Sequence, residues 1–232
     1  MMEQLPLGVR LRAASTFASF QTGPNGPLVA ALEARAVTAG LAPLWLYGTP
    51  GSGRTHLLQA SCALAGARGR RACYLPLGES WPSAEMIAGL EQLDIVCLDD
   101  LEHVVGDAAW ERALFALYND LAERGGSLVI SANAAPAALP VRLPDLASRL
   151  AACIVWQLRA LDEGEQGMAL LVRARALGIE LPDETLAYLQ RRLPRDLAAL
   201  CDALDRLDAA ALSQQRRLTV PFVKSVLQWT AE

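Results

Sequence analysis

The fold is decided by the stretch Gly48-Thr49-Pro50-Gly51-Ser52-Gly53-Arg54-Thr55. It follows an apolar run, residues 44–47, and precedes a second apolar run, residues 57–60, that is typical of a helix. Glycines let the backbone between a strand and a helix adopt conformations closed to other residues, so that successive N–H groups point inward at an anion. The helix adds free N–H groups and the positive end of its dipole. The stretch therefore predicts a phosphate-binding loop, and the alternative is a glycine-rich turn without a ligand.

The last two residues of this loop bear on its chemistry. Thr55 stands where a hydroxyl normally completes the shell of a nucleotide-bound Mg²⁺ ion. Arg54 occupies the place of the usual lysine, and its planar fork cannot fill the same slot as the compact charge of lysine. We expect a site that binds ADP or ATP with Mg²⁺ and hydrolyses the triphosphate poorly.

The composition favours a compact globular protein with a small net charge. The chain has 232 residues, 53% of them hydrophobic and 20% charged, and a net charge of −4, which argues against a protein that coats nucleic acid through charge alone. No apolar run approaches the length of about 20 residues that a membrane helix needs, and the N-terminus does not resemble a secretory signal. The five cysteines have no C-x-x-C spacing, which favours small buried side chains in a reducing cytoplasm. They are Cys62, Cys73, Cys97, Cys153 and Cys201.

Apolar stretches alternate with helical patterns through the first two thirds of the chain. Strands are predicted at 44–47, 72–75, 94–100, 128–131 and 153–156, and helices at 28–39, 83–91 and 107–123. Strands that are almost continuously apolar predict a parallel sheet covered by helices on both faces. After about Leu161 only helical patterns remain, at 163–176, 183–192, 195–212 and 220–229. We therefore expect a tail (1–15), an α/β nucleotide-binding domain (16–160) and a small α-helical domain (161–232).

Polar residues follow two of the predicted strands, where ligands of open parallel sheets bind. Asp99 ends the third strand and is placed to hold Mg²⁺ directly or through water, and Asp100 follows where many ATPases carry a glutamate that orients the attacking water. Both acids are alternatively caps of the strand. Asn133 follows the next strand and either contacts a γ-phosphate or water, or is a turn residue.

A single arginine stands just before the fifth strand. Arg149 in this place either points into the site of a neighbouring molecule and supplies positive charge in trans, or is an ordinary solvated side chain. His56 is expected to pack on the helix after the phosphate loop, and His103 to lie in a loop.

The motifs together resemble the AAA+ module of the bacterial replication initiator DnaA, and more closely the Hda family of short DnaA homologues that inactivate the initiator. The resemblance covers nearly the whole chain. The DnaA-like segments are Thr16-Phe17, Phe20, Asn25, 43–58 and 98–100. The Hda-like features are Arg54, 143–150 and 217–224.

The resemblance implies roles for further residues. Gln4, Leu5 and Leu7 match the start of the family's motif for the DNA polymerase III sliding clamp, whereas Gly8 and Val9 depart from its last two places. A glutamine amide anchors such a motif by hydrogen bonds while leucines fill an apolar groove. From the residues alone, this segment is either an untethered tail or a docking peptide. Phe20 is implied at the nucleotide, and Arg149 matches the family's arginine finger.

The lid departs from the family at one position. Ala198 stands where the family places a phosphate-sensing arginine, and Arg195, one helical turn earlier, is the candidate substitute. Together with Arg54 and Asp100, this predicts weak hydrolysis by the protein itself.

These inferences converge on a cytoplasmic AAA+ regulator of replication initiation, carrying ADP by family analogy. It is expected to dock on the DNA-loaded clamp, to trigger hydrolysis of DnaA-bound ATP through Arg149, and to meet DNA only through the clamp, with no membrane contact. The sequence leaves open whether the protein forms a homo-oligomer. The alternative is a free-standing AAA+ ATPase or a motor of the helicase-loader type. A DNA-binding initiator is disfavoured, because we expect no origin-binding domain after residue 232.

Overall fold

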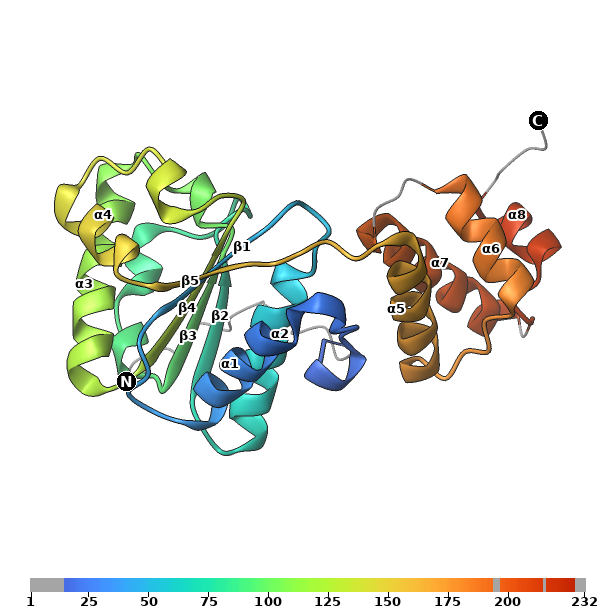
Figure 1. Cartoon of the computed structure of the whole chain (residues 1–232), viewed down its shortest axis with the longest axis horizontal. Helices are drawn as coiled ribbons and strands as arrows, with labels where there is room; N and C mark the ends of the chain where they lie inside the picture. The colour runs from blue at the N-terminus through green and yellow to red at the C-terminus, as the bar shows by residue number, and fades with distance from the viewer. Residues whose placement is uncertain (1–14, 194–196, 215, 228–232) are drawn as a thin grey trace.

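A five-stranded parallel sheet forms the centre of the larger part of the molecule (Figure 1). The structure is a computed structural model that describes residues 15–193, 197–214 and 216–227. The strands lie in the order β2-β3-β4-β1-β5. Their bounds are β1 Leu44–Tyr47, β2 Ala72–Pro76, β3 Ile95–Asp99, β4 Ser127–Ala132 and β5 Ile154–Gln157. The prediction of a parallel α/β sheet is confirmed.

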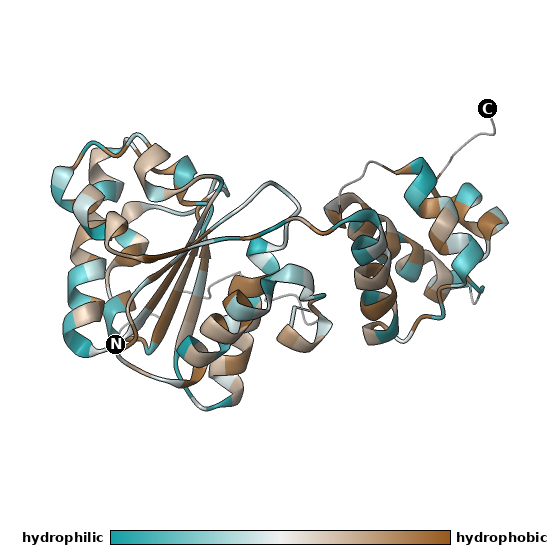
Figure 2. Ribbon diagram, viewed as in Figure 1, coloured by the Kyte–Doolittle hydropathy of each residue, from teal (hydrophilic) through white to brown (hydrophobic). Residues whose placement is uncertain are grey.

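Helices cover the two faces of the sheet as separate layers (Figure 1). On one face lie α1 (Gly26–Val37) and α2 (Arg54–Ala67), and on the other α3 (Ala108–Arg124) and α4 (Pro144–Ala151). Each face has its own apolar core, and alternate residues of the strands enter one core or the other, as the two-residue period of a strand requires. Figure 2 shows the strands and the inward faces of these helices as the hydrophobic interior.

Local chemistry fixes the ends of the long helix α3. Asp107 caps its start, with Oδ1 accepting hydrogen bonds from the backbone N–H groups of Ala109 (2.8 Å) and Trp110 (3.0 Å). Gly125 ends it in the left-handed conformation at φ 72°, which glycine adopts without a Cβ penalty. The predicted helix at 107–123 is thus confirmed to within one residue at each end.

Two predictions about this sheet are wrong in detail. The segment predicted as one helix at 83–91 contains two short 3₁₀ helices, η3 (Ala84–Ile87) and η4 (Leu90–Gln92), because Gly89 between them has φ +92° and breaks any continuous helix. The fifth strand is not covered on both faces. Among the described strands it is an edge strand paired only with β1, and Ile154 and Val155 remain 45% and 43% exposed.

The second body is a bundle of four helices with its own core (Figure 1). Its helices are α5 (Glu163–Ala176), α6 (Asp183–Arg192), α7 (Leu197–Gln214) and α8 (Val220–Leu227). Arg173 on α5 pairs with Asp205 on α7 at 2.6 Å, and the Thr185 hydroxyl on α6 donates to the Leu218 carbonyl at 3.0 Å. These polar contacts join helices of the lid and add to the stability that its small hydrophobic core provides. We refer to this bundle as the lid.

The composition bears on membrane helices and on the state of the cysteines, and the described residues give a result for each. None of their helices is long and apolar enough to cross a membrane. All five cysteines are free thiols, four of them buried, and Cys201 is half-buried.

Candidate nucleotide-binding site

The predicted phosphate loop joins β1 to α2 at the carboxyl end of the sheet. Gly51 and Gly53 have φ of 75° and 102°, a region that other residues rarely adopt. A Cβ at Gly53 would lie 2.8 Å from the ring of Phe20, so a side chain there is excluded by space as well as by backbone conformation. Phe20 thus braces the loop from the N-terminal side, and its ring also lies 5.4 Å from that of His56.

Buried polar atoms in the loop lack hydrogen-bond partners among the described residues. They are the hydroxyl oxygen of Ser52 and one guanidinium nitrogen, Nη1, of Arg54. Buried polar groups are almost always satisfied, so such atoms point to a ligand or water. A phosphate group supplies acceptors for both, and the loop therefore fits the phosphates of a nucleotide.

Asp99 is the centre of a hydrogen-bonded cluster at the end of β3. The side chain is 1% exposed, and its Oδ2 accepts from the Thr55 hydroxyl at 2.7 Å and from the Tyr74 hydroxyl at 2.8 Å. Its Oδ1 accepts from the Ser131 hydroxyl. Burial and the neighbouring Asp99 raise the pKa of Tyr74, which keeps the phenol a proton donor. Asp99 therefore accepts hydrogen bonds from three neighbouring hydroxyl groups.

Thr55 and Asp99 together match the donors that Mg²⁺ uses beside a nucleotide. Mg²⁺ is usually bound by one or two protein oxygens, with water and phosphates completing its octahedron. The described residues contain no group of three or more His, Cys, Asp or Glu suited to hold a metal by themselves. The two oxygens fit a Mg²⁺ ion that the nucleotide brings with it.

Arg54 is turned away from the usual lysine role by two acids. Its Nη2 lies 3.0 Å from Oδ1 of Asp100, and its Nη1 lies 3.7 Å from Oε1 of Glu102. Asp100 has φ 57°, the one positive φ among the described non-glycine residues. Burial and the neighbouring Asp99 raise the pKa of Asp100, while Arg54 opposes the shift. The acid predicted to orient water is thus engaged in an ion pair.

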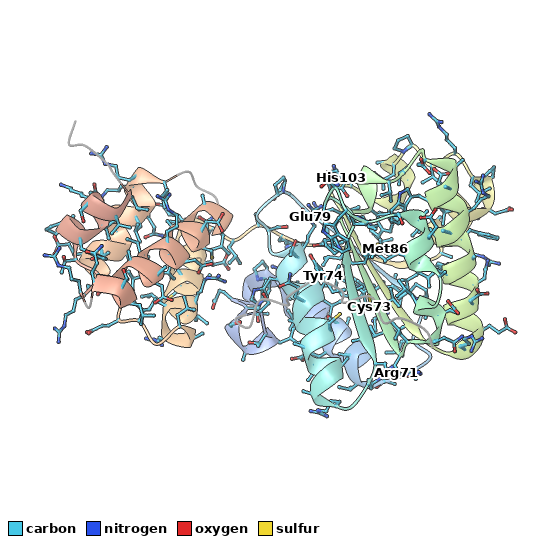
Figure 3. The ribbon with its side chains drawn as sticks, turned by 180° about the vertical axis from the view of Figure 1, so that it is seen from behind. Arg71, Cys73, Tyr74, Glu79, Met86 and His103 are labelled. Atoms are coloured by element: carbon cyan, nitrogen blue, oxygen red, sulfur yellow. The ribbon has the colours of Figure 1, made fainter. Side chains whose placement is uncertain are left out.

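The loop opens into a cavity of about 750 Å³ that both bodies line. Phe20 and the phosphate loop form one wall, Tyr74 and Glu79 a second, and Arg173 of the lid a third. Figure 3 shows Tyr74 and Glu79 along one side of the sheet, with Arg71 toward the opposite end. The volume falls in the range typical of small-molecule and cofactor sites.

Other predicted site residues lie apart from this cavity. Asn133 follows β4 and is exposed, and Arg149 is exposed in the last turn of α4; neither lines the cavity. Gln4, Leu5, Leu7 and Arg195 lie outside the described residues, as does the side chain of Ala198. His56 packs as predicted, with Nε2 2.8 Å from the Thr16 carbonyl, and burial lowers its pKa. His103 is the exposed last residue of a short 3₁₀ helix, η5 (Leu101–His103).

Sequence reasoning missed four polar residues, of which three contact Asp99 or Arg54 and the fourth lies on α3, away from the cavity. They are Tyr74, Ser131, Glu102 and Glu111. Tyr74 and Ser131 could have been suspected from the sequence, because each is a polar residue within a predicted apolar strand. Both strands neighbour the strand that ends in Asp99.

Glu111 on α3 is a buried carboxylate that organises the approach to α4. It is 2% exposed and accepts hydrogen bonds from the backbone N–H groups of Gly106 (2.8 Å), Arg142 (3.0 Å) and Leu143 (2.7 Å). Leu143 is the N-cap of α4, whose side chain cannot cap. Glu111 therefore supplies the missing cap from a neighbouring helix and fixes the helix that carries Arg149.

A glycine-rich loop between a parallel strand and a helix, an adjacent strand ending in Asp99, and a helical lid on the same cavity define a P-loop AAA+ protein. The lid, residues 162–227, matches the family model described as "Hda, lid domain". In its lid the chain is similar to the Hda family, and its overall fold is similar to that of DnaA.

Solved structures share this fold across most of the chain. Domain III of the replication initiation protein DnaA from Thermotoga maritima has a TM-score of 0.79 and 24% identity, covering 95% of this chain and 98% of that one. AMPPCP-bound DnaA from Aquifex aeolicus has a TM-score of 0.69 and 20% identity, covering 88% and 68%. The RuvB Holliday junction branch migration motor from Thermotoga maritima has a TM-score of 0.64 and 18% identity, covering 90% and 69%.

Proposed function

We propose that this protein is a cytoplasmic negative regulator of replication initiation, which binds ADP with Mg²⁺ and stimulates hydrolysis of the ATP bound to a DnaA initiator. The phosphate loop, Thr55 and Asp99 would hold the nucleotide and its metal. Gln4, Leu5 and Leu7 would dock the protein on the DNA-loaded sliding clamp, so that contact with DNA is indirect. The Hda-type lid and the nucleotide bound to a DnaA of the same fold support this class of function.

One observation carries the proposal: Arg149 is exposed on α4, whereas the nucleotide cavity is lined by α2, the N-terminal segment, β2 and the lid. No carboxylate of the described chain lies within ion-pair distance of it. An arginine that does not line its own nucleotide cavity is available to another molecule's nucleotide.

The chemistry assigned to Arg149 is charge stabilisation. Water attacks the γ-phosphorus of the initiator's ATP, the bond from that phosphorus to the β–γ bridging oxygen breaks, and ADP and phosphate leave. The guanidinium stabilises the charge on the equatorial oxygens of the transferred group, a contribution of about 10³–10⁵ in rate for arginine fingers. Arginine suits this role because its planar fork makes two hydrogen bonds at once.

The test measures hydrolysis of initiator-bound ATP with and without DNA-loaded clamp. We expect Arg149→Ala to abolish the stimulation while ADP affinity and clamp binding remain, and Arg149→Lys to rescue little because lysine lacks the fork. Arg68→Ala, an exposed arginine that ends α2 at the other end of the sheet, is the matched control. Loss of ADP affinity with stimulation intact would place Arg149 at its own site.

A companion variant addresses the clamp. Gln4→Ala with Leu7→Ala should remove clamp binding and the clamp-dependent part of the stimulation, with an unchanged melting temperature, since the described core starts later in the chain. Clamp binding that survives this double change would locate the docking site elsewhere.

The protein's own ATP turnover separates the proposed regulator from the alternative class. Fast ATP turnover by the purified protein alone, near the typical enzyme value of about 10 per second, would favour a free-standing AAA+ ATPase.

A further inference from the structure

Asn25 stands at the start of α1 but does not cap that helix. Asparagine is one of the residues preferred at a helix N-cap, where its side-chain oxygen accepts a hydrogen bond from the first turn. At the N-cap of α1 the Asn25 side chain makes no such bond, although the residue is only 4% exposed. A residue suited to capping is therefore used for another contact.

That contact holds the linker, the stretch of chain that leads from β5 to α5 (Figure 1). Nδ2 of Asn25 donates to the Arg159 carbonyl at 3.1 Å, and Oδ1 accepts from the Arg159 N–H at 2.9 Å. One side-chain amide thus satisfies both backbone groups of a residue 134 positions later. The preceding residue is held as well, because the Leu158 N–H donates to the Tyr47 carbonyl of β1 at 2.7 Å. Within the described chain, the linker is hydrogen-bonded to the sheet domain up to Arg159.

The first turn of α5 lies against the same N-terminal segment. Asp162 and Glu165 form the capping box of α5, with each side chain accepting from the other's backbone N–H at 2.8 Å and 2.9 Å. A Cβ at Gly23 would lie 2.9 Å from both Oε1 of Glu165 and Cδ2 of Leu161, and Gly23 has φ 47°. Glycine therefore gives the start of the lid its space. We call Gly23 and Asn25 the lid seat.

Open space separates the lid from the phosphate loop on two sides. The nucleotide cavity lies on one side, with Arg173 on its lid wall. A second cavity, of about 260 Å³, lies between residues 49–52 of the loop and Gln166 and Leu197 of the lid. Close packing fixes the position of neighbouring elements, and here it is interrupted by two cavities. The position of the lid therefore depends strongly on the linker and on the lid seat.

We infer that Asn25 is a positioning residue for the lid: by holding Arg159 it fixes where the lid begins, and so how closely the lid wall of the cavity approaches a nucleotide. The inference rests on the proposed function in one respect, namely that a nucleotide occupies this cavity. Phe20 lines the cavity from the segment that ends in Asn25. One short segment thus forms a wall of the cavity and sets the position of the wall opposite.

Cleavage by trypsin after Arg159 reports on the linker itself. Arg159 is exposed, but a protease must draw the backbone around the cleaved bond into its own site, which the two bonds from Asn25 oppose. In Asn25→Ala we expect the fragment that begins at Ala160, identified by mass spectrometry, to appear about tenfold faster, the scale of one or two hydrogen bonds. The matched control is Asn119→Ala on α3, which removes a hydrogen bond of 2.9 Å to the Phe115 carbonyl and should leave this cleavage unchanged.

Asn25→Asp separates the hydrogen bonds from the space that the side chain fills. An ionised carboxylate accepts from the Arg159 N–H but repels the Arg159 carbonyl oxygen, whereas a protonated carboxyl donates to that oxygen as the amide does. Burial and the carbonyl oxygen raise the pKa of such a carboxyl above its usual value of about 3.9. We expect Asn25→Asp to bind fluorescent mant-ADP about tenfold more weakly than the wild type at pH 8, and the difference to shrink as the pH falls toward 6. Asn119→Asp should match the wild type throughout.

The two measurements overturn the inference in different ways. Folded Asn25 variants with the wild-type cleavage rate and ADP affinity would show that Asn25 does not hold the linker, and the proposed function would stand. Faster cleavage with unchanged ADP affinity would show that the linker does not set the cavity. A defect of Asn25→Asp that is independent of pH would trace to packing. A wild type that binds no ADP overturns the proposed function, and the inference with it. Melting temperatures identify unfolded variants, and Asn25→Asp at pH 6 replaces Asn25→Ala in the cleavage assay if the latter does not fold.

Discussion

The buried side chain of Asp99 accepts hydrogen bonds from three hydroxyl groups. Together with Thr55, it marks the part of the site where Mg²⁺ is expected. Thr55, Tyr74 and Ser131 all donate to it. A cation that binds both oxygens requires little rearrangement, because the Thr55 hydroxyl oxygen and Oδ2 of Asp99 already lie 2.7 Å apart and the hydroxyl keeps its proton as it turns.

Removing Asp99 should remove the metal dependence of nucleotide binding. We expect EDTA to weaken ADP binding to the wild type, because it removes the Mg²⁺ ion that would join the protein oxygens to the phosphates. In Asp99→Asn, EDTA should change the affinity little. Asp94→Asn, just before the same strand at its opposite end, is the control. An Asp99→Asn protein whose ADP affinity still falls with EDTA would place the metal on other ligands.

At this scale, the sequence was sufficient for residues whose role follows from position in a motif. The phosphate loop and Asp99 sit where a strand must end, and parallel strands end at one edge. The partners of Arg54 were not predictable, because its contact with Glu102 depends on the left-handed turn at Asp100, which brings the acid back toward α2. Such a turn at an aspartate has no signal in local sequence.

Helix α4 shows how a distant residue sets the position of a functional element. Burial raises the pKa of Glu111, but hydrogen bonds from the backbone of Arg142, Gly106 and Leu143 outweigh it, and the pKa lies below its ordinary value of 4.5. Because the folded pKa is lowered, this stabilisation is present above pH 4.5 and is lost as the pH falls through the folded pKa. The loss of this stabilisation in acid would therefore also loosen the start of α4, the helix that carries Arg149.

We expect Glu111→Gln to lower the free energy of unfolding at pH 7 by about 1–3 kcal/mol, the cost of leaving buried donors poorly satisfied. The difference from the wild type should shrink as the pH falls below 4.5. Stimulation of initiator hydrolysis should fall while ADP affinity remains, since Glu111 is not a cavity residue. Urea unfolding across pH checks the first part, with Glu123→Gln on the same helix as the control. Parallel pH curves for wild type and Glu111→Gln would contradict it.

Helices with a strong hydrophobic period or with recognisable capping residues could be predicted from the sequence. Helix α3 is an example, since Asp107 caps its start and Gly125 its end. The segment at 83–91 did not, because its helical composition is interrupted by a glycine whose positive φ depends on packing. The exposure of β5 was hidden for a different reason. Its apolar residues are typical of a buried strand, and only the strand order makes it an edge.

The whole molecule consists of two hydrophobic bodies that meet around one cavity. The sheet domain has cores on both faces, and the lid has a third core of its own. Phe20 and Arg54 line the cavity from one body, and Arg173 and Leu197 from the other. Arg173 is further tied to α7 through Asp205, so a ligand that contacts Arg173 contacts a side chain braced by two lid helices. A nucleotide between them would therefore stabilise both.

Because a ligand that binds only the folded state stabilises it by RT ln(1 + [L]/Kd), ADP at 100 times its Kd should add about 2.7 kcal/mol. We expect that gain in both bodies: calorimetry with ADP should show a single transition, or two that move upward together. Arg173→Ala should reduce the ADP-induced shift of the lid transition, measured as the difference with and without ADP. Arg206→Ala, an exposed arginine on α7, should not. An ADP-induced shift confined to the sheet domain would mean that the nucleotide binds without engaging the lid, and the lid would then have no part in holding it.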